Sequence, residues 1–288
     1  MCAAVIGGVY YARGRSLMRP EELAAHLPIK DAMLVYIDGA AIRRSGLMSL
    51  VAGSKAAEEL EYQQFVDQTL FDYRTDLDAV AAAIQGQNIF FLLRGRFHWR
   101  NLMDYATKQG GTCHNGFCSV AGSRPERMIS FYALRSDLMA MAVSDDPTAA
   151  YALHDQNSKL ALSVPPQPVW ILIPASVLAK PEELPAGIRP FAPVLKNADE
   201  VVFALGPEHD GMDLTLKVTC KDTGAASALL IDLEKTTASL RAHHHAQAAA
   251  GDLGAVLTAG TFRRENTQVF GHWPIPRSFI DAVVSSPY

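Results

Sequence analysis

The sequence predicts an α+β protein built from two tandem units, each with a mainly antiparallel sheet and helices packed on one face. Three observations lead to this prediction. The segment 163–170, SVPPQPVW, has three prolines within four positions, which favours an extended connector between compact units. The same order of elements occurs on both sides of this connector. Each half also contains a dipeptide favoured in β-hairpin turns, Asn115-Gly116 in the first and Asp210-Gly211 in the second.

The bulk composition agrees with a folded protein of two domains. With 288 residues, 49% of them hydrophobic, the chain can bury a large core, and its length suggests two domains of ordinary size. The formal net charge is −4, from 26 Lys and Arg against 30 Asp and Glu. Because no basic field favours nucleic acid or an anionic membrane, we expect no nucleic-acid partner.

The first half begins with a buried strand and continues with helices and hairpins. Leu60, Phe65, Val66 and Leu70 recur near helical spacing, and Gly110-Gly111 permits a left-handed helix cap. Short polar connections between apolar runs predict hairpins. The expected elements are a strand over 33–38, helices over 39–53 and 56–71, strands over 77–84 and 89–95, a helix over 98–108, the hairpin around 115–116, strands over 128–134 and 138–144, and a helix that starts at 146–147.

The second half repeats this order of elements. Its expected elements are a strand over 169–174, a proline-broken region, strands over 200–206 and 212–220, a helix over 223–249 with Asp222 as amino cap, one or two strands over 262–275, and a closing helix over 278–284. Both halves therefore follow the ferredoxin-like split βαβ arrangement, and a duplication is our hypothesis. We place the domains at 26–164 and 165–288, after an apolar segment over 1–25.

The amino-terminal segment contains an apolar run from Met1 to Ala12 that ends at Arg13. As a helix this run would span about 18 Å, against roughly 30 Å for the core of a bilayer, so it cannot cross a membrane alone. It also lacks the positive n-region of a signal peptide. One interpretation is that it is the tail of a longer export signal or membrane anchor. The other is an ordinary apolar strand or helix.

The stretch GGTCHNGFCS, 110–119, predicts a disulfide across a hairpin. A two-residue type I′ turn at Asn115-Gly116 places His114 opposite Phe117. Cys113 then lies opposite Cys118, at a position where Cα atoms are about 4.5 Å apart, close to the separation in disulfides. A reduced, inert pair and a metal or redox site stay open as alternatives, although no second cysteine pair follows. An oxidised pair would indicate a compartment outside the cytosol.

The stretch RGRFHWR, 94–100, offers a candidate ligand surface made of Arg94, Arg96, His98 and Trp99. Arginine side chains can bind phosphates, and exposed aromatic rings beside them can stack on bases. The alternative is structural: the aromatic rings face the core and the arginine stems cover the edges of the protein.

Other polar residues are weaker candidates. Asp76 and Asp78 could form an acid–base pair, because alternate strand residues share a face, or they are simple turn and strand-entry residues. His243 to His245 are favoured as a solvated helix end, because consecutive helical side chains diverge by about 100°. We interpret His272 as part of a packed strand end. The chain has no phosphate-binding glycine loop, dinucleotide fingerprint or Gly-x-Ser-x-Gly elbow, so we assign no catalytic, metal or cofactor residue.

At RGRFHW (94–99), CHNGFC (113–118) and ISFYALRSDLMAMAVS (129–144), the sequence resembles a group of bacterial proteins of unknown function that are predicted to be exported or membrane-anchored. The resemblance covers most of the chain from Leu27 onward. It implies a cell-envelope setting and carries over no functional residue.

Three functional hypotheses follow. The first is a non-catalytic binding or structural protein of the cell envelope, facing the periplasm, whose partner is another envelope protein or an apolar ligand. The second is a hydrolytic or metal-dependent enzyme with a site assembled from residues such as Asp76, Asp78, His98 and His272. The third is a cytoplasmic nucleic-acid binder that uses Arg94–Arg100. We favour the first, because sheets with helices on one face leave an open surface and no catalytic constellation is visible.

Overall fold

The computed structural model describes residues 18–45, 60–124, 126–154, 163–180, 182, 184, 192–195, 197–208, 211–243 and 253–285. The amino-terminal run over 1–12, His244 and His245, and the side chain of His243 lie outside the described residues. Among the helices that are described, none has both the length and the apolar character needed to cross a membrane.

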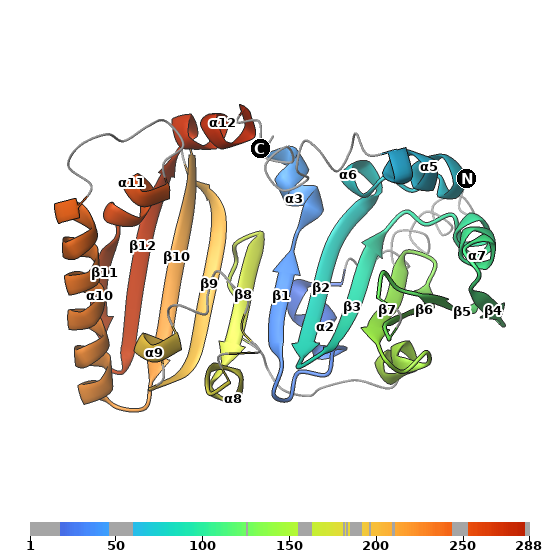
Figure 1. Ribbon diagram of the computed structural model, residues 1–288. Coiled ribbons are helices and arrows are strands. Elements are labelled where there is room, and N and C mark those ends of the chain that lie inside the picture. Colours follow the sequence, from blue (N-terminus) through green and yellow to red (C-terminus); the bar gives the residue numbers. More distant parts are fainter. Residues whose placement is uncertain are drawn as a thin grey trace, which may run out of the picture.

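The described strands form one continuous antiparallel sheet. Its strand order is β11-β12-β10-β9-β8-β1-β2-β3-β7-β6-β5-β4, and every neighbouring pair is antiparallel (Figure 1). The strands are β1 (Met33–Ile37), β2 (Leu77–Gln85), β3 (Asn88–Gly95), β4 (Thr112–His114), β5 (Phe117–Ala121), β6 (Met128–Arg135), β7 (Leu138–Ser144), β8 (Val169–Pro174), β9 (Ala198–Glu208), β10 (Gly211–Cys220), β11 (Thr261–Glu265) and β12 (Gln268–Pro276).

Helices lie on both faces and at one end of this sheet. They are α2 (Pro20–Ala25), α3 (Gly39–Arg44), α5 (Leu60–Thr69), α6 (Tyr73–Asp76), α7 (Trp99–Lys108), the 3-10 helix η1 (Ala149–Leu153), α8 (Ala175–Leu178), α9 (Ala192–Leu195), α10 (Thr223–His243), α11 (Leu253–Thr258) and α12 (Arg277–Ser285). We call the face toward the viewer in Figure 1 the front face and the opposite one the back face.

The sheet confirms the α+β class but corrects the expectation of two separate sheets. Strand β1 pairs with β8 across four residue pairs, from Leu34↔Leu172 to Ile37↔Val169, and this pairing joins the two halves. An unpaired strand edge leaves a row of backbone donors and acceptors without partners, so two halves that each end in such an edge gain by pairing. The boundary placed between residues 164 and 165 stays a prediction.

The ferredoxin-like topology within each half is not confirmed. In the first half β1 and β2, which helices connect, pair directly with each other, and so do β8 and β9 in the second half. A split βαβ unit would instead place another strand between two strands that a helix connects. The two halves nevertheless share a strand order. Counted outward from the β1–β8 pairing, the strands of the first half follow the order β1-β2-β3-β7-β6, and those of the second half follow the order β8-β9-β10-β12-β11.

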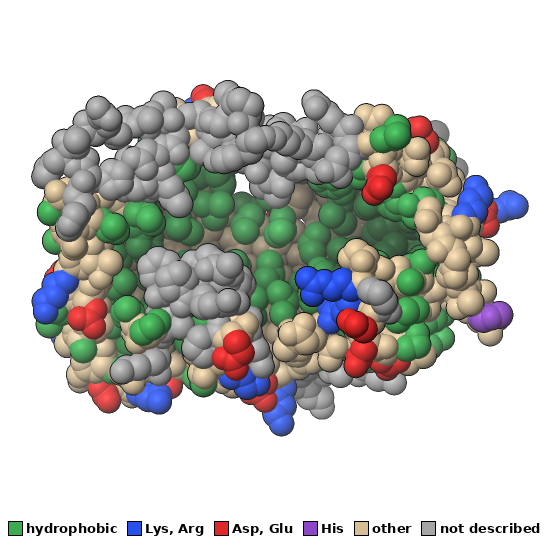
Figure 2. All heavy atoms as spheres, in the orientation of Figure 1, with side chains coloured by type: hydrophobic (Ala, Val, Ile, Leu, Met, Phe, Trp, Pro, Cys, Tyr) green, Lys and Arg blue, Asp and Glu red, His purple; other side chains and the backbone are tan. Residues whose placement is uncertain are grey.

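The core has a layer on each face of the sheet. On the back face, Leu23 and Leu27 from the α2 region pack over small residues of β2 such as Ala81 and Ala83, all of them buried. On the front face, α10 covers the strands of the second half and α7 covers those of the first half. Figure 2 shows hydrophobic side chains gathered in a hollow over the central strands of the front face.

Several predicted elements are confirmed in detail. Asp222 caps α10, since its carboxylate accepts a hydrogen bond from the backbone N–H of Ala225 at 2.7 Å. Gly110 has the left-handed φ of 82° expected after α7. The stretch 262–275 is a hairpin of two strands, β11 and β12, which turns at Asn266 with φ 53°. The helix expected from Asp146-Pro147 is only the short η1.

Candidate functional site

The first candidate site is a pocket of about 240 Å³ on the front face, between α5, α7 and the strands β3, β5, β6 and β7. We call it the apolar pocket. None of its lining residues is charged, and its surface is apolar although Gln109 and Tyr105 belong to the lining. The other lining residues are Phe65, Phe71, Leu93, Phe97, Leu102, Ala106, Val120, Ile129, Phe131, Met139 and Met141.

Aromatic rings build the wall of the apolar pocket. The ring of Phe65 on α5 meets that of Tyr105 on α7 edge to face, with centroids 5.2 Å apart. Phe71 and Phe97 stack at the same centroid distance. Such ring pairs add roughly 0.5–1.5 kcal/mol beyond the apolar area that they bury. The contact between Phe65 and Tyr105 therefore joins α5 to α7 over the strands, and the apolar pocket lies beneath these helices.

The cysteine hairpin borders this pocket, and its predicted geometry is confirmed. Cys113 and Cys118 are directly opposite in register, form a disulfide, and have Cα atoms 4.1 Å apart. Asn115 and Gly116 have φ of 51° and 81°, as a type I′ turn requires. Cys118 is fully buried and belongs to the same core cluster as pocket residues of α7 and β6. The disulfide therefore ties β4 to β5, which lines the pocket.

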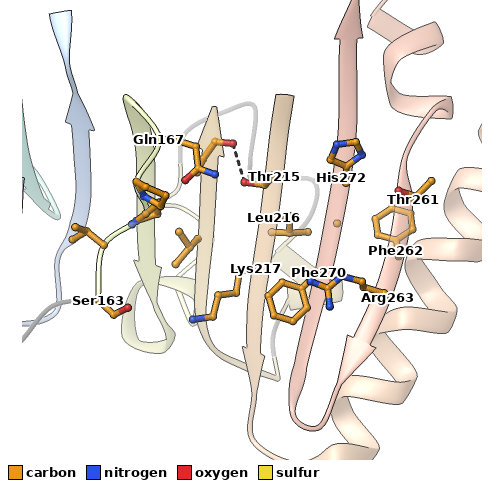
Figure 3. A pocket seen from close by; sticks show the side chains of 16 residues that line it. Ser163, Gln167, Thr215, Leu216, Lys217, Thr261, Phe262, Arg263, Phe270 and His272 are labelled. Atoms are coloured by element: carbon orange, nitrogen blue, oxygen red, sulfur yellow. Dashed lines mark hydrogen bonds between the residues drawn. The ribbon is translucent and has the colours of Figure 1, made fainter. Parts of the chain in front are cut away.

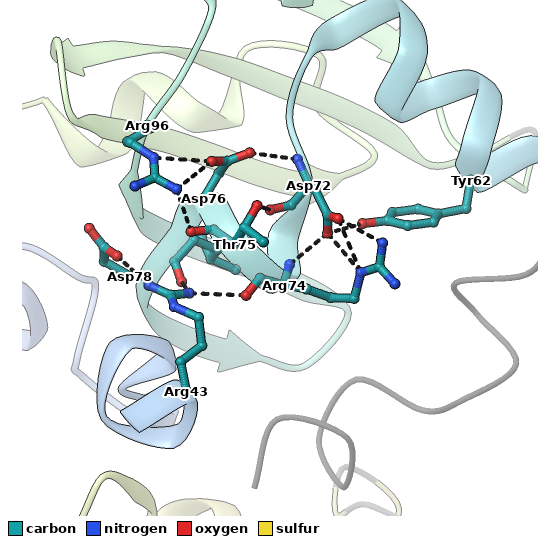
Figure 4. A network of polar contacts seen from close by, with 9 residues as sticks. Arg43, Tyr62, Asp72, Arg74, Thr75, Asp76, Asp78 and Arg96 are labelled. Carbon is teal, nitrogen blue, oxygen red and sulfur yellow. Dashed lines mark hydrogen bonds and ion pairs between the residues drawn. The ribbon is translucent and has the colours of Figure 1, made fainter. Parts of the chain in front are cut away.

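A polar network lies where β2 begins (Figure 4). Asp76 binds the guanidinium of Arg96, with Nη2 2.7 Å from Oδ1. Asp78 is ion-paired with another arginine, Arg43 of α3. The two carboxylates each have a cation of their own, so the structure favours their role as strand-entry residues over an acid–base pair.

Asp72 is the most connected carboxylate of this network. It accepts a hydrogen bond from the Tyr62 hydroxyl at 2.8 Å and pairs with the Arg74 guanidinium at 2.7 Å. The hydrogen bonds from Arg74 lower the pKa of Asp72 to about 2, and the bond from Tyr62 adds to this effect. Burial raises the pKa of Tyr62, and the hydrogen bond to the Asp72 carboxylate raises this pKa further. These contacts tie the first turn of α5, through Tyr62, to the start of α6, which precedes β2.

The four residues of the predicted ligand surface do not come together. Arg94 is buried, and its Nη1 donates to the carbonyl oxygen of Met18 at 2.8 Å. Arg96 is exposed and held by Asp76. His98 is exposed before the first turn of α7.

Trp99, the fourth of them, is partly buried. Its Nε1 donates to the carbonyl oxygen of Ser136 at 2.9 Å, and its ring packs beside that of Phe97. The side chains of Arg94 and Trp99 therefore serve internal contacts, as the structural alternative predicted.

The second candidate site is a larger, open pocket of about 760 Å³ on the back face of the second half (Figure 3). We call it the back pocket. Its floor is formed by β9, β10, β12 and β11, and its wall is the proline-rich connector over 163–167. The lining residues are Ser163, Val164, Pro165, Pro166, Gln167, Val202, Ala204, Thr215, Leu216, Lys217, Thr261, Phe262, Arg263, Phe270, Gly271 and His272.

His272 at this pocket has a carboxylate partner. Its Nε2 lies 2.7 Å from Oδ1 of Asp213, close enough for an ion pair, although the two groups are not aligned as a hydrogen bond. Burial raises the pKa of Asp213, and the neighbouring His272 opposes this shift. Sequence reasoning placed His272 at a packed strand end and missed the pocket. The signal that was present is the alternation in 212–220 and 268–273, which puts Thr215, Lys217 and His272 on one face.

Across the described ranges, His, Cys, Asp and Glu side chains do not gather in groups of three that could hold a metal ion. The fold and the two pockets define an α+β protein with one broad antiparallel sheet and a hollow on each face.

Comparison with known proteins gives structural neighbours only. No protein-family model matches this chain, and no curated protein matches it either. Its fold is similar to solved structures of TP0453. Crystal form III has a TM-score of 0.49 and 8% sequence identity, over 91% of this chain and 98% of that one. Crystal form I has a TM-score of 0.48 and 11% identity, over 93% of this chain and 97% of that one.

Proposed function

We propose that this protein is a non-catalytic binding protein of the bacterial cell envelope that holds an apolar ligand in the apolar pocket. The observation that carries the proposal is the lining of this pocket, which contains no charged side chain. A polar or ionic ligand would lose its hydration there without gaining partners, whereas an apolar group gains by leaving water.

The size of the apolar pocket narrows the class of ligand. An engineered cavity of about 150 Å³ stays dry and binds benzene, and pockets for drug-sized ligands measure about 300–1,000 Å³. At about 240 Å³, this pocket suits a group larger than benzene, such as an alkyl chain, that is one part of an amphiphile. Because the pocket surface is apolar, the polar end of such an amphiphile would stay in the solvent.

The envelope setting is part of the same proposal. A disulfide between Cys113 and Cys118 persists in oxidising compartments such as the periplasm and is rare in the cytosol. The resemblance of 94–99, 113–118 and 129–144 to exported or membrane-anchored bacterial proteins supports the same setting. The apolar run over 1–12 would then serve as part of an export signal or anchor.

The matched strand order of the two halves supports a further part of the proposal, a tandem repeat. Five strands on each side of the β1–β8 pairing follow the same outward order. We infer a duplicated meander unit in which only the first half has kept the apolar pocket and the β4–β5 hairpin.

Fluorescence of the neutral probe N-phenyl-1-naphthylamine tests the binding function. The unmodified protein should bind the probe and raise its emission. In the variant Ala106→Phe the new ring fills the pocket, because Ala106 is buried in its lining, and we expect affinity to fall at least tenfold. Ala133→Phe places the same ring on an exposed residue of β6 outside the lining and should bind as the unmodified protein does.

A second variant that fills the apolar pocket keeps the test valid if Ala106→Phe does not fold. Val120→Phe narrows the pocket from a partly exposed position of β5. If Ala106→Phe unfolds, as far-UV circular dichroism would show, Val120→Phe takes its place. Probe affinity that is unchanged in a folded filling variant would overturn the proposal.

A further inference from the structure

The floor of the back pocket is built from two rows of side chains that cross the sheet. In one row Lys217, Phe270 and Arg263 lie opposite one another on β10, β12 and β11. In the next row on the same face, His272 lies between Thr215 and Thr261. Side chains directly opposite on neighbouring antiparallel strands have Cβ atoms about 4.5–5.5 Å apart, so each row acts as one surface.

The charges in this lining have one sign. Lys217 and Arg263 are cations, His272 becomes one when protonated, and the lining contains no Asp or Glu. The chain as a whole carries a net charge of −4, and carboxylates lie beside the pocket, where Glu265 pairs with Arg263 and Asp213 with His272, so Lys217 supplies the positive charge that is not already paired. A concave surface lined by one sign of charge concentrates ions of the opposite sign.

Lys217 is the cation most available to a ligand. Within the part of the chain that the structure describes, its ammonium group has no ion-pair partner, although the side chain is partly buried. Arg263 is paired with Glu265 on the same strand, and its guanidinium lies 4.3 Å from the centroid of the Phe270 ring. That stacking holds the guanidinium over the row that contains Lys217.

The pocket also has an apolar side. Phe270 lies between the two cations (Figure 3), and the apolar residues Val202, Ala204 and Pro165 also belong to the lining. The small side chain of Ala204 sits next to Thr215 in register. Inorganic anions need no such surface, whereas an anion attached to a ring or alkyl group can bury that group here.

We propose that the back pocket is a binding site for a small organic anion, with its phosphate or carboxylate group at Lys217 and Arg263 and its apolar or aromatic body on Phe270, which lies between these cations. The site is on the opposite face of the sheet from the apolar pocket and takes a different class of ligand. It is therefore independent of the proposed function.

Isothermal titration calorimetry with phenyl phosphate tests this site. We expect phenyl phosphate to bind, and both phenol and inorganic phosphate to bind at least tenfold more weakly, because each offers only half of the contacts. Lys217→Gln and Arg263→Gln should each weaken phenyl phosphate binding about five- to tenfold, since a charge-assisted hydrogen bond is lost.

Arg264→Gln is the matched control. Arg264 is next to Arg263 on β11, is exposed, and points to the other face by strand alternation. The variant removes the same charge, so affinity should stay within twofold of the unmodified protein. Equal weakening by Arg264→Gln, or equal binding of phenol, would overturn the proposal, because attraction by overall charge or by apolar surface would then explain the result.

One further variant separates this proposal from the apolar-ligand function. Ala106→Phe fills only the apolar pocket, so its affinity for phenyl phosphate should be unchanged. Loss of phenyl phosphate binding in this variant would place the anion in the apolar pocket and overturn the assignment. If the neutral probe does not bind, the proposed apolar-ligand function is wrong, but the phenyl phosphate result still tests the anion site.

Discussion

Tyr36 on β1 and Trp170 on β8 stack across the strand pair that joins the two halves, with ring centroids 5.4 Å apart and ring planes 21° apart. Both side chains are almost completely buried. This burial, with Asp38 nearby, raises the pKa of Tyr36 to about 12. The contact between the halves is therefore packed as a protein core is, and we expect the two halves to unfold together.

Replacement of Trp170 tests the role of this contact. Trp170→Ala should lower the free energy of unfolding by about 3–5 kcal/mol, because it removes a large buried ring and leaves a cavity. Urea denaturation followed by circular dichroism measures this change. Tyr151→Ala removes a ring that is 54% exposed and should cost far less. Two separate transitions in the unmodified protein would contradict cooperative unfolding of the halves.

The disulfide should stabilise the edge of the sheet beside the apolar pocket. Replacing both Cys113 and Cys118 by Ala removes a cross-link that closes a short loop, which the chain-entropy model values at about 2 kcal/mol. Urea denaturation under non-reducing conditions would detect this loss. Protein secreted to the periplasm should have a mass lower by two hydrogens, located in the peptide with both residues, while the buried Cys220 stays a free thiol. Two alkylatable thiols in that peptide would contradict the envelope proposal.

The carboxylate of Asp72 predicts a pH dependence of stability. Its pKa is about 2 in the folded protein, below the ordinary value of 3.8, so ionised Asp72 stabilises the fold above about pH 4. This contribution is lost as the pH falls from about 4 to about 2. Asp72→Asn should therefore cost up to about 2 kcal/mol at pH 7 and little at pH 2. Urea titrations across this pH range measure the difference.

The matched control for this prediction is Asp67→Asn, at an exposed position of α5. Its stability should follow that of the unmodified protein at every pH. An Asp72→Asn variant whose deficit stayed constant between pH 7 and pH 2 would show that the charge of Asp72 does not stabilise the fold.

Gly95, at the end of β3, is predicted to tolerate no side chain. A Cβ atom there would lie 2.3 Å from the carbonyl oxygen of Asp76, a backbone atom that accepts a hydrogen bond from the N–H of Arg96. Gly95→Ala should cost about 1–3 kcal/mol, because the backbone must move.

Gly116→Ala is the comparison for this substitution. Gly116 has φ 81° and open space around it, so its replacement should cost only about 1 kcal/mol, through backbone strain. Thermal unfolding ranks the two variants, and equal losses would contradict the steric argument.

The sequence alone determined the features that depend on neighbouring residues. Asn115-Gly116 specifies a type I′ turn, the turn fixes the register, and the register places Cys113 opposite Cys118. The cap of α10 at Asp222 follows for the same reason, since a capping side chain needs only the next few residues. Hairpins such as β2–β3 could likewise be predicted from two apolar runs and a short connection.

The tertiary structure decided everything that depends on contacts between distant segments. The pairing of β1 with β8 carries no local signal, so the sequence could not distinguish one sheet from two. The arginine partner of Asp76 comes from the residue after β3 and that of Asp78 from α3. The back pocket forms between the proline-rich connector and the strands β9 and β10. Local patterns set which face of a strand is polar, but only the packing of remote elements sets what that face meets.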